Sequence, residues 1–190
     1  GSSALMLVYA YLQQTHKEPL KVMTTPATYI ATANVAKFLG QTVSFADIDI
    51  DSYCLSPISV KSSKAPFDVL SLVHLYGNAA DVEMFRRLNP EVAIVEDCAQ
   101  AFGTRIDGKH VGTTEFGCYS MFPTKNLSCA GDGGFILCPA EAYETLVRLR
   151  DNGRFFGMEV GLATGNCRLS EMQAAVAREQ LKKVPSQIAR

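Results

Sequence analysis

The chain alternates between short apolar runs and longer stretches in which apolar residues recur with helical spacing. The short runs are bounded by glycine, proline or aspartate, which is typical of buried strands. We predict strands at Lys21–Thr24, Thr42–Ala46, Phe67–Leu75, Val92–Val95 and Gly134–Cys138, and a further short apolar strand before Lys125. Because helical patterns separate these runs, the sequence indicates an α/β fold with a mainly parallel sheet.

Capping residues indicate where the helices begin and end. Ser2 or Ser3 is predicted to cap the first helix and Ser170 the last one. The helix entered from Thr24–Asn34 is expected to run to Leu39 and to stop at Gly40. Further helices are predicted at Val82–Leu88, Pro139–Asp151 and Glu171–Val184, the last with apolar contacts from Met172, Ala175, Val176 and Ala177. The glycine-rich stretch Arg154–Gly165 is predicted to be a loop.

Composition places the chain among soluble globular proteins. Its 190 residues are 47% hydrophobic and 19% charged with a formal net charge of -1, so we expect one domain and no nucleic-acid partner. The apolar run Ala4–Leu12 is too short to span a bilayer and has no basic leader, so we expect no membrane partner. The six cysteines lie at least nine residues apart, which fits no zinc motif and favours reduced thiols in the cytoplasm.

Two segments resemble ligand-binding loops but lack a required residue. Asp47–Asp51 has alternating aspartates, yet Ser52 and Ile58 stand where a calcium loop needs glycine and glutamate. Gly103–Lys109 matches the start of a phosphate-binding P-loop, but His110 replaces the serine or threonine that would bind magnesium. We predict a solvated strand end for the first segment and a hairpin turn at Asp107-Gly108 for the second.

Three separated features are together compatible with pyridoxal phosphate chemistry. Lys125 lies between an apolar strand and a glycine-rich turn, Asp97 follows a buried strand, and the helix start at Ser2 offers amide donors. That cofactor needs an amine, an anion at its pyridine nitrogen and donors for its phosphate. Each feature also has an ordinary interpretation: a snorkelling lysine, a helix-capping aspartate and a serine cap. The residues alone therefore leave a dehydrogenase or a binding domain open.

Seven motifs in order resemble the DegT/DnrJ/EryC1/StrS sugar aminotransferase family. They are Gly1-Ser-Ser-Ala-Leu5, Thr28-Tyr-Ile-Ala-Thr-Ala-Asn34, His74-Leu-Tyr-Gly77, Glu96-Asp-Cys-Ala-Gln-Ala-Phe-Gly103, Tyr119-Ser-Met-Phe-Pro-Thr-Lys-Asn126, Gly131-Asp-Gly-Gly134 and Asn166-Cys-Arg-Leu-Ser-Glu-Met-Gln-Ala-Ala175. The resemblance implies the three-layer α/β/α large domain of aspartate-aminotransferase-like enzymes, with a mainly parallel mixed sheet. Residues 1–190 would then be an excerpt without the family's N-terminal arm and small C-terminal domain.

The resemblance also implies a role for each matched residue. Lys125 would form the internal aldimine and act as the proton-transferring base, and Asp97 would hold the pyridine nitrogen. The remaining cofactor contacts would come from Tyr29 on the ring face, Gln100 near the ring hydroxyl, Ser2, Ser3 and Ser120 at the phosphate, and Asn166 at the phosphate of a neighbouring subunit's cofactor. Arg168 lies near the same subunit boundary or is a surface arginine. No metal is implied.

The implied function is amino transfer from glutamate or glutamine to a keto-sugar, most naturally a nucleotide-linked one, by way of pyridoxamine phosphate in a cytoplasmic homodimer. Lysine at position 125 favours transamination, since dehydrating relatives carry histidine there. The first alternative is a regulatory or structural homologue that binds the cofactor without catalysis. A second, resting on Gly103–Lys109, is a nucleotide-binding protein, against which His110 argues.

Overall fold

A six-stranded sheet forms the centre of the structure, a computed structural model that describes residues 1–154 and 163–188. Neighbouring strands follow the order β2-β1-β3-β4-β7-β8. All of these pair in parallel except β8, which is antiparallel to β7. The strands are β1 (Lys21–Thr24), β2 (Thr42–Phe45), β3 (Val69–Val73), β4 (Ala93–Asp97), β7 (Phe116–Ser120) and β8 (Gly134–Leu137). The predicted α/β fold with a mainly parallel mixed sheet is confirmed.

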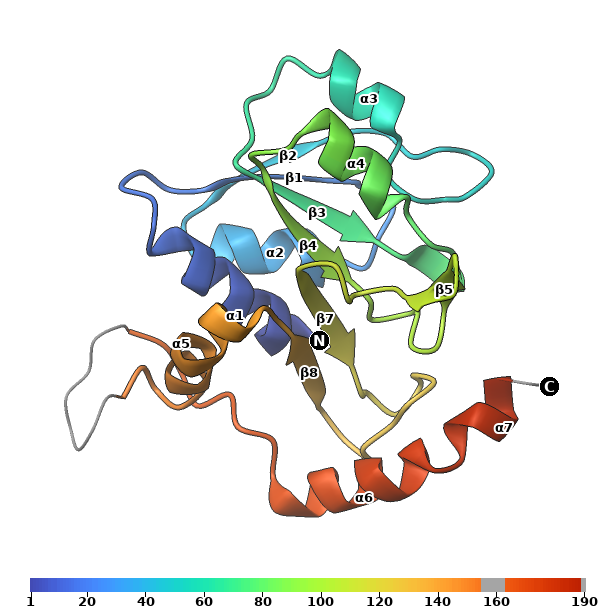
Figure 1. Cartoon of the computed structure of the whole chain (residues 1–190). Coiled ribbons are helices and arrows are strands. Elements are labelled where there is room, and N and C mark those ends of the chain that lie inside the picture. The colour runs from blue at the N-terminus through green and yellow to red at the C-terminus, as the bar shows by residue number, and fades with distance from the viewer. Residues whose placement is uncertain (155–162, 189–190) are drawn as a thin grey trace.

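Helices cover both faces of this sheet (Figure 1). One face packs against α1 (Ser2–Gln13), α2 (Ala31–Phe38) and α5 (Ala140–Arg150), and the other against α3 (Pro57–Ser62) and α4 (Val82–Leu88). Consecutive strand residues divide between the two cores: Val22 lies with α1, whereas Met23 lies with α4. Strands buried on both faces explain why the sequence shows continuous apolar runs there.

The helix predictions were mostly confirmed, with three corrections. The helix α1 begins after Gly1, and neither Ser2 nor Ser3 makes a side-chain capping bond, so the predicted serine cap is wrong. Ser170 does cap α6 (Glu171–Leu181), accepting from the Gln173 amide, but a separate helix α7 (Val184–Ile188) follows it. Met172 is 80% exposed and Ala175 is exposed too, whereas apolar contacts were predicted for both. Residues 155–162 of the predicted loop lie outside the described residues.

The two segments that resemble ligand-binding loops, Asp47–Asp51 and Gly103–Lys109, fold as the sequence predicted. Arg105–Ile106 (β5) and Lys109–His110 (β6) form an antiparallel hairpin around Asp107 and Gly108, whose φ angles of 50° and 79° suit a tight turn. A P-loop needs a strand before it and a helix after it, and this hairpin offers neither. The aspartates of Asp47–Asp51 are exposed in a turn that lies beyond β2, which fits a solvated segment.

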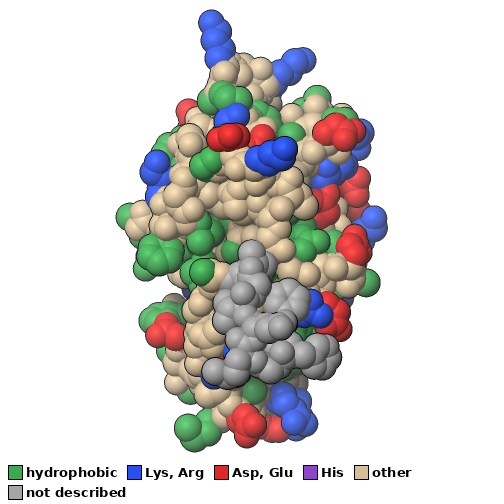
Figure 2. Space-filling view, turned by 90° about the vertical axis from the view of Figure 1, so that its left-hand side faces the viewer, with side chains coloured by type: hydrophobic (Ala, Val, Ile, Leu, Met, Phe, Trp, Pro, Cys, Tyr) green, Lys and Arg blue, Asp and Glu red, His purple; other side chains and the backbone are tan. Residues whose placement is uncertain are grey.

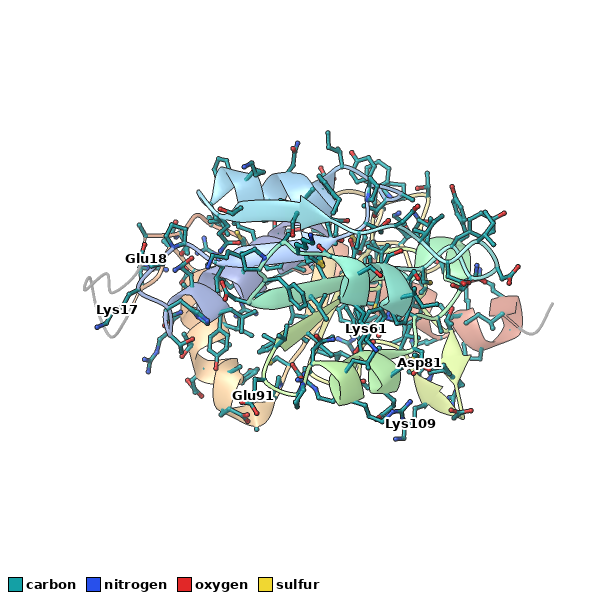
Figure 3. All side chains as sticks on the ribbon, turned by 90° about the horizontal axis from the view of Figure 1, so that it is seen from above. Lys17, Glu18, Lys61, Asp81, Glu91 and Lys109 are labelled. Carbon is teal, nitrogen blue, oxygen red and sulfur yellow. The ribbon has the colours of Figure 1, made fainter. Side chains whose placement is uncertain are left out.

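Charged side chains of both signs are interspersed on the face seen in Figure 2, in keeping with the net charge of -1. Lys17, Glu91 and Lys109 are among those that lie at the periphery (Figure 3). Within residues 1–154 and 163–188, no helix is both long and apolar enough to cross a membrane. All six cysteines are free thiols, and burial raises the pKa of Cys54, Cys98 and Cys118.

Candidate active site

The residues predicted for the site surround one cavity of about 1020 Å³ at the carboxyl ends of the parallel strands. Asp97 is the last residue of β4 and Ser120 the last of β7. Open parallel sheets bind ligands at this edge, where the strand ends leave a crevice. The lining includes all eight predicted site residues: Ser2, Ser3, Tyr29, Asp97, Gln100, Ser120, Lys125 and Asn166.

Asp97 is a buried carboxylate with part of its hydrogen-bonding capacity in use. Its side chain is 6% exposed, and its Oδ1 accepts from the Ala99 amide at 3.1 Å. Its Oδ2 accepts from the hydroxyl of Thr32 on α2 at 2.8 Å. Since a carboxylate offers about four lone-pair positions, Asp97 retains capacity for a cationic or N–H partner in the cavity.

Two threonines of the second sequence motif complete this arrangement, and sequence reasoning gave neither a role. Thr32 Oγ1 lies 3.0 Å from Thr28 Oγ1, and because Thr32 donates its proton to Asp97, Thr28 must donate to Thr32. Both hydroxyl dipoles therefore point toward the carboxylate and stabilise its negative charge. Thr32 and Asp97 are 65 residues apart in sequence, so only the fold brings them together.

The first turn of α1 opens into the cavity. The Leu5 amide donates to the Gly1 carbonyl oxygen at 3.1 Å, which leaves the amides of Ser2, Ser3 and Ala4 without acceptors in the helix. No hydrogen bond of the Ser2 or Ser3 hydroxyl is found within the described residues. Amide dipoles and two hydroxyls at one helix start are a donor set suited to a phosphate.

Glycine is needed where α1 meets the sheet. A Cβ on Gly1 would lie 3.1 Å from Ser120 Cβ, and a Cβ on Gly134 would lie 2.8 Å from Gly1 N. Gly1 N donates to the Gly133 carbonyl oxygen at 3.2 Å. The missing side chains thus allow the helix start to lie directly against the ends of β7 and β8.

Lys125 lies in the connection between β7 and β8, which comprises residues 121–133. This connection begins at the carboxyl end of β7. Leu127 and Cys129 anchor the connection by burial, and the Lys125 amide donates to the Phe122 carbonyl oxygen at 2.9 Å. The side chain is half-buried and lines the cavity. In the described part of the chain its ammonium group makes no hydrogen bond or ion pair, so it is available to a ligand.

Tyr29 and Gln100 flank the cavity in different ways. Tyr29 precedes α2 and is 70% exposed, so its ring is open to a ligand. The side-chain Oε1 of Gln100 accepts from the Tyr76 amide at 3.1 Å, which leaves the side-chain NH₂ group as its free donor. A free donor in the cavity that Lys125 and Asp97 also line suits an oxygen substituent on a bound ring.

Asn166 and Arg168 come from the segment that leads into α6. Asn166 is exposed, accepts from the Arg168 amide at 3.1 Å through its side chain, and bridges to Asp151 through its backbone. Arg168 forms an ion pair with Asp151 on the surface. Asn166 thus contributes to the wall of the same cavity as Lys125.

A second cluster of polar side chains, His74, Glu96 and Cys98, is buried on the opposite side of β4 and has the composition of a metal site. The ring nitrogens of His74 and the carboxylate oxygens of Glu96 already make hydrogen bonds within the chain. His74 Nδ1 accepts from the Ala80 amide at 3.0 Å, so Nε2 carries the proton and donates to Glu96 at 2.9 Å. Glu96 also accepts from the Gly112 and Thr114 amides at 2.6 and 3.2 Å. The cluster is therefore a hydrogen-bonded support for the strand ends.

The pKa of Glu96 reflects this support. Burial alone would raise the pKa of this carboxyl group, but the hydrogen bond from His74 and the two from backbone amides outweigh burial. The net effect holds the pKa below its ordinary value of 4.5.

The donor set around the cavity fits pyridoxal phosphate. A free amine, a buried carboxylate with unused capacity, a helix start with two hydroxyls and an exposed aromatic ring are the groups that this cofactor requires. Each comes from a different element: Lys125 from the β7–β8 connection, Asp97 from β4, Ser2 and Ser3 from α1, and Tyr29 from the entry to α2.

Solved structures with the same fold define the class of this chain, an aminotransferase-like α/β/α domain. The structure of DesV from S. venezuelae, in complex with a ketimine intermediate, matches with a TM-score of 0.89 at 34% identity, covering 97% of this chain and 51% of the other. The chain belongs to the DegT/DnrJ/EryC1/StrS aminotransferase family, whose sequence model matches residues 1–190.

Two curated relatives that are equally similar to this chain have different names, one an aminotransferase and the other a regulatory protein. The UDP-N-acetyl-3-dehydro-alpha-D-glucosamine 3-aminotransferase of Acidithiobacillus ferrooxidans is 36% identical over 185 residues, which are 95% of this chain and 50% of the relative. A "Pleiotropic regulatory protein" of Geobacillus stearothermophilus is 36% identical over 166 residues, 82% of this chain and 43% of the relative. The chain spans about half the length of the curated relatives it matches.

Proposed function

We propose that the protein carrying this chain is a pyridoxal phosphate-dependent aminotransferase that moves an amino group from glutamate or glutamine to a nucleotide-linked keto-sugar. The observation that carries the proposal is the convergence of Lys125, Asp97 and the start of α1 on one cavity. A relative named as an aminotransferase of a UDP-linked dehydro-sugar supports the substrate class. Residues 1–190 would be the cofactor-binding large domain.

When bound, pyridoxal phosphate supplies an aldehyde that takes up the amino group and a ring that holds electrons released at the substrate carbon. Lys125 Nζ is the amine that would hold the cofactor and, once released, move the proton at the substrate carbon. Asp97 would keep the pyridine nitrogen protonated, because a close negative charge favours the cationic form. Ser2, Ser3 and Ser120 would bind the phosphate, Gln100 the ring hydroxyl, and the ring of Tyr29 would exclude water from one face.

We further propose a cytoplasmic homodimer with shared sites, in which Asn166 reaches the cofactor phosphate of a neighbouring subunit. Its position on an exposed segment beside Arg168 supports a role at a boundary. Size determination by light scattering, together with loss of phosphate affinity in Asn166→Ala, tests this part of the proposal. A monomer that binds the cofactor with wild-type affinity contradicts it.

Lys125→Ala tests the chemistry. We expect loss of the absorbance band of lysine-linked cofactor and loss of transamination by several orders of magnitude, because no other amine among the predicted site residues can replace Lys125. The matched control is Lys109→Ala, which removes an exposed lysine at the periphery (Figure 3). A Lys125→Ala protein that keeps the band and transaminates contradicts the proposal.

The relative named as a regulatory protein favours one second candidate, a cofactor-binding homologue without catalysis. Addition of glutamate, and in a separate assay of glutamine, to the cofactor-loaded wild-type protein separates the two. An aminotransferase converts the bound aldehyde form to the amine form, with a change in absorbance, whereas a regulatory homologue leaves the spectrum unchanged.

A further inference from the structure

Two tyrosines in the segments that follow β2 and β3 adopt a backbone conformation that is normally left to glycine. Tyr53 has a φ of 58° and Tyr76 a φ of 57°. The left-handed region is unfavourable for a bulky L-residue, and residues held there concentrate at functional sites. Tyr76 comes directly before Gly77, which has a φ of 86°, so two left-handed residues follow each other after β3.

Main-chain bonds hold both tyrosines in place. The Tyr76 amide donates to the Gln100 side chain at 3.1 Å, and the Tyr53 amide donates to the Asp49 carbonyl oxygen at 2.9 Å. The Asn78 side chain joins the two segments by donating to the Ser52 carbonyl oxygen at 2.8 Å. A glycine at either tyrosine position could make the same amide bond without strain, so these bonds do not explain why the side chain is a tyrosine.

Packing within the chain does not explain the rings either. The Tyr76 side chain is 75% exposed and that of Tyr53 is 44% exposed. Their rings meet edge to face, with centroids 6.3 Å apart at 70°. Neither hydroxyl has a hydrogen bond in the part of the chain that the structure describes. Two strained backbone positions thus carry exposed aromatic rings, and one of them, Tyr76, is hydrogen-bonded to Gln100 in the cavity wall.

We propose that Tyr53 and Tyr76 form the stacking site for the planar base of the nucleotide-linked substrate. This inference rests on the proposed function. A base is the one aromatic group of such a substrate, and an exposed tyrosine face stacks on any base. The neighbouring turn carries the exposed Asp49 and Asp51, whose charge disfavours the diphosphate here and leaves the neutral base as the fitting group.

The test uses the full-length protein that carries this chain and compares Tyr76→Asn with Tyr76→Phe. Asparagine tolerates the left-handed conformation but removes the ring, whereas phenylalanine keeps the ring. We expect the dissociation constants of UDP and dTDP, measured by calorimetry, to rise roughly 5- to 100-fold in Tyr76→Asn. In Tyr76→Phe they should stay within about threefold of wild type. The unfolding midpoint of Tyr76→Asn should not fall, because the substitution relieves strain.

A second variant and a ligand without a base make the outcome decisive. Tyr53→Asn should weaken UDP binding by a smaller factor, since its ring is less exposed. Inorganic pyrophosphate should bind all variants alike. Unchanged UDP affinity in Tyr76→Asn, or an equal loss for pyrophosphate, overturns the inference. The wild-type protein is also given glutamate and, in a separate assay, glutamine: a cofactor spectrum that neither donor changes refutes the proposed function, whereas the UDP comparison separately decides the stacking site.

Discussion

Glu96 and Asp97 are neighbours in β4, and both are buried carboxylates, yet they lie in different environments on opposite sides of the sheet. Glu96 accepts three hydrogen bonds, from His74 and from the amides of Gly112 and Thr114. Asp97 accepts two, one of them from the hydroxyl of Thr32. Glu96 therefore binds parts of its own chain together, while Asp97 keeps capacity for a ligand.

The kind of donor matters as much as the number. Both oxygens of Glu96 face backbone amides, which can only donate. Asp97 has an amide on one oxygen and a hydroxyl on the other, and a hydroxyl can rotate to accept instead. The carboxylate in the cavity can thus exchange partners without leaving a donor unpaired, whereas Glu96 cannot. Glu96 and Asp97 thus differ in how much hydrogen-bonding capacity remains for a ligand.

Asp97→Asn should give the largest effect. The asparagine carbonyl oxygen can keep the Ala99 amide bond, and the Thr32 hydroxyl can turn to accept from the new NH₂ group. We expect the free energy of unfolding to change by less than about 1 kcal/mol. Transamination should fall on the order of 100- to 1000-fold, because the negative charge is gone. Steady-state kinetics and urea unfolding measure the two quantities. A kcat near that of wild type in Asp97→Asn would contradict the proposed difference between Asp97 and Glu96.

Glu96→Gln should show the reverse pattern. Whichever side-chain atom becomes NH₂ must face a backbone amide, so we expect a loss of roughly 1–3 kcal/mol in unfolding free energy. At a temperature where the variant is folded, kcat should remain close to wild type. Equal losses of kcat for Glu96→Gln and Asp97→Asn would show that the two carboxylates act as a unit.

The same variant should alter the pH dependence of stability. The pKa of Glu96 is lower in the folded protein than the ordinary 4.5, so its stabilisation is fully present above that pH. It is lost as the pH falls below 4.5 and through the folded pKa. Urea midpoints between pH 6 and pH 3 should therefore decline more steeply in wild type than in Glu96→Gln.

Thr32→Val should lower activity less than Asp97→Asn does. Valine keeps the shape of threonine but removes the hydroxyl that donates to Asp97, so we expect an activity loss of about tenfold and a stability loss of about 1 kcal/mol. The matched control is Thr42→Val, at an exposed position in β2. An unchanged kcat in Thr32→Val would show that Asp97 acts without help from α2.

The sequence predicted most of the fold because strand burial and helix capping are local signals. It also identified the residues that meet in the cavity, chiefly Lys125 and Asp97, through the motifs around them. It could not predict the Thr32–Asp97 bond, since no local pattern connects residues 65 positions apart. The predicted serine cap of α1 was wrong because the N-cap position is Gly1, which has no side chain to accept a capping bond. Periodicity likewise marked Met172 as apolar without showing whether another residue covers it.

The reversed direction of β8 has a consequence for the placement of Lys125. If the strand after β7 were parallel to it, the chain would have to return to the amino ends of the strands. Such a crossover typically takes a dozen or more residues and includes a helix. The antiparallel return instead keeps residues 121–133 at the edge where β4 and β7 end. Because β8 runs antiparallel to β7, the connection between them stays at the strand ends that border the cavity. Lys125, which belongs to that connection, is therefore placed at the cavity.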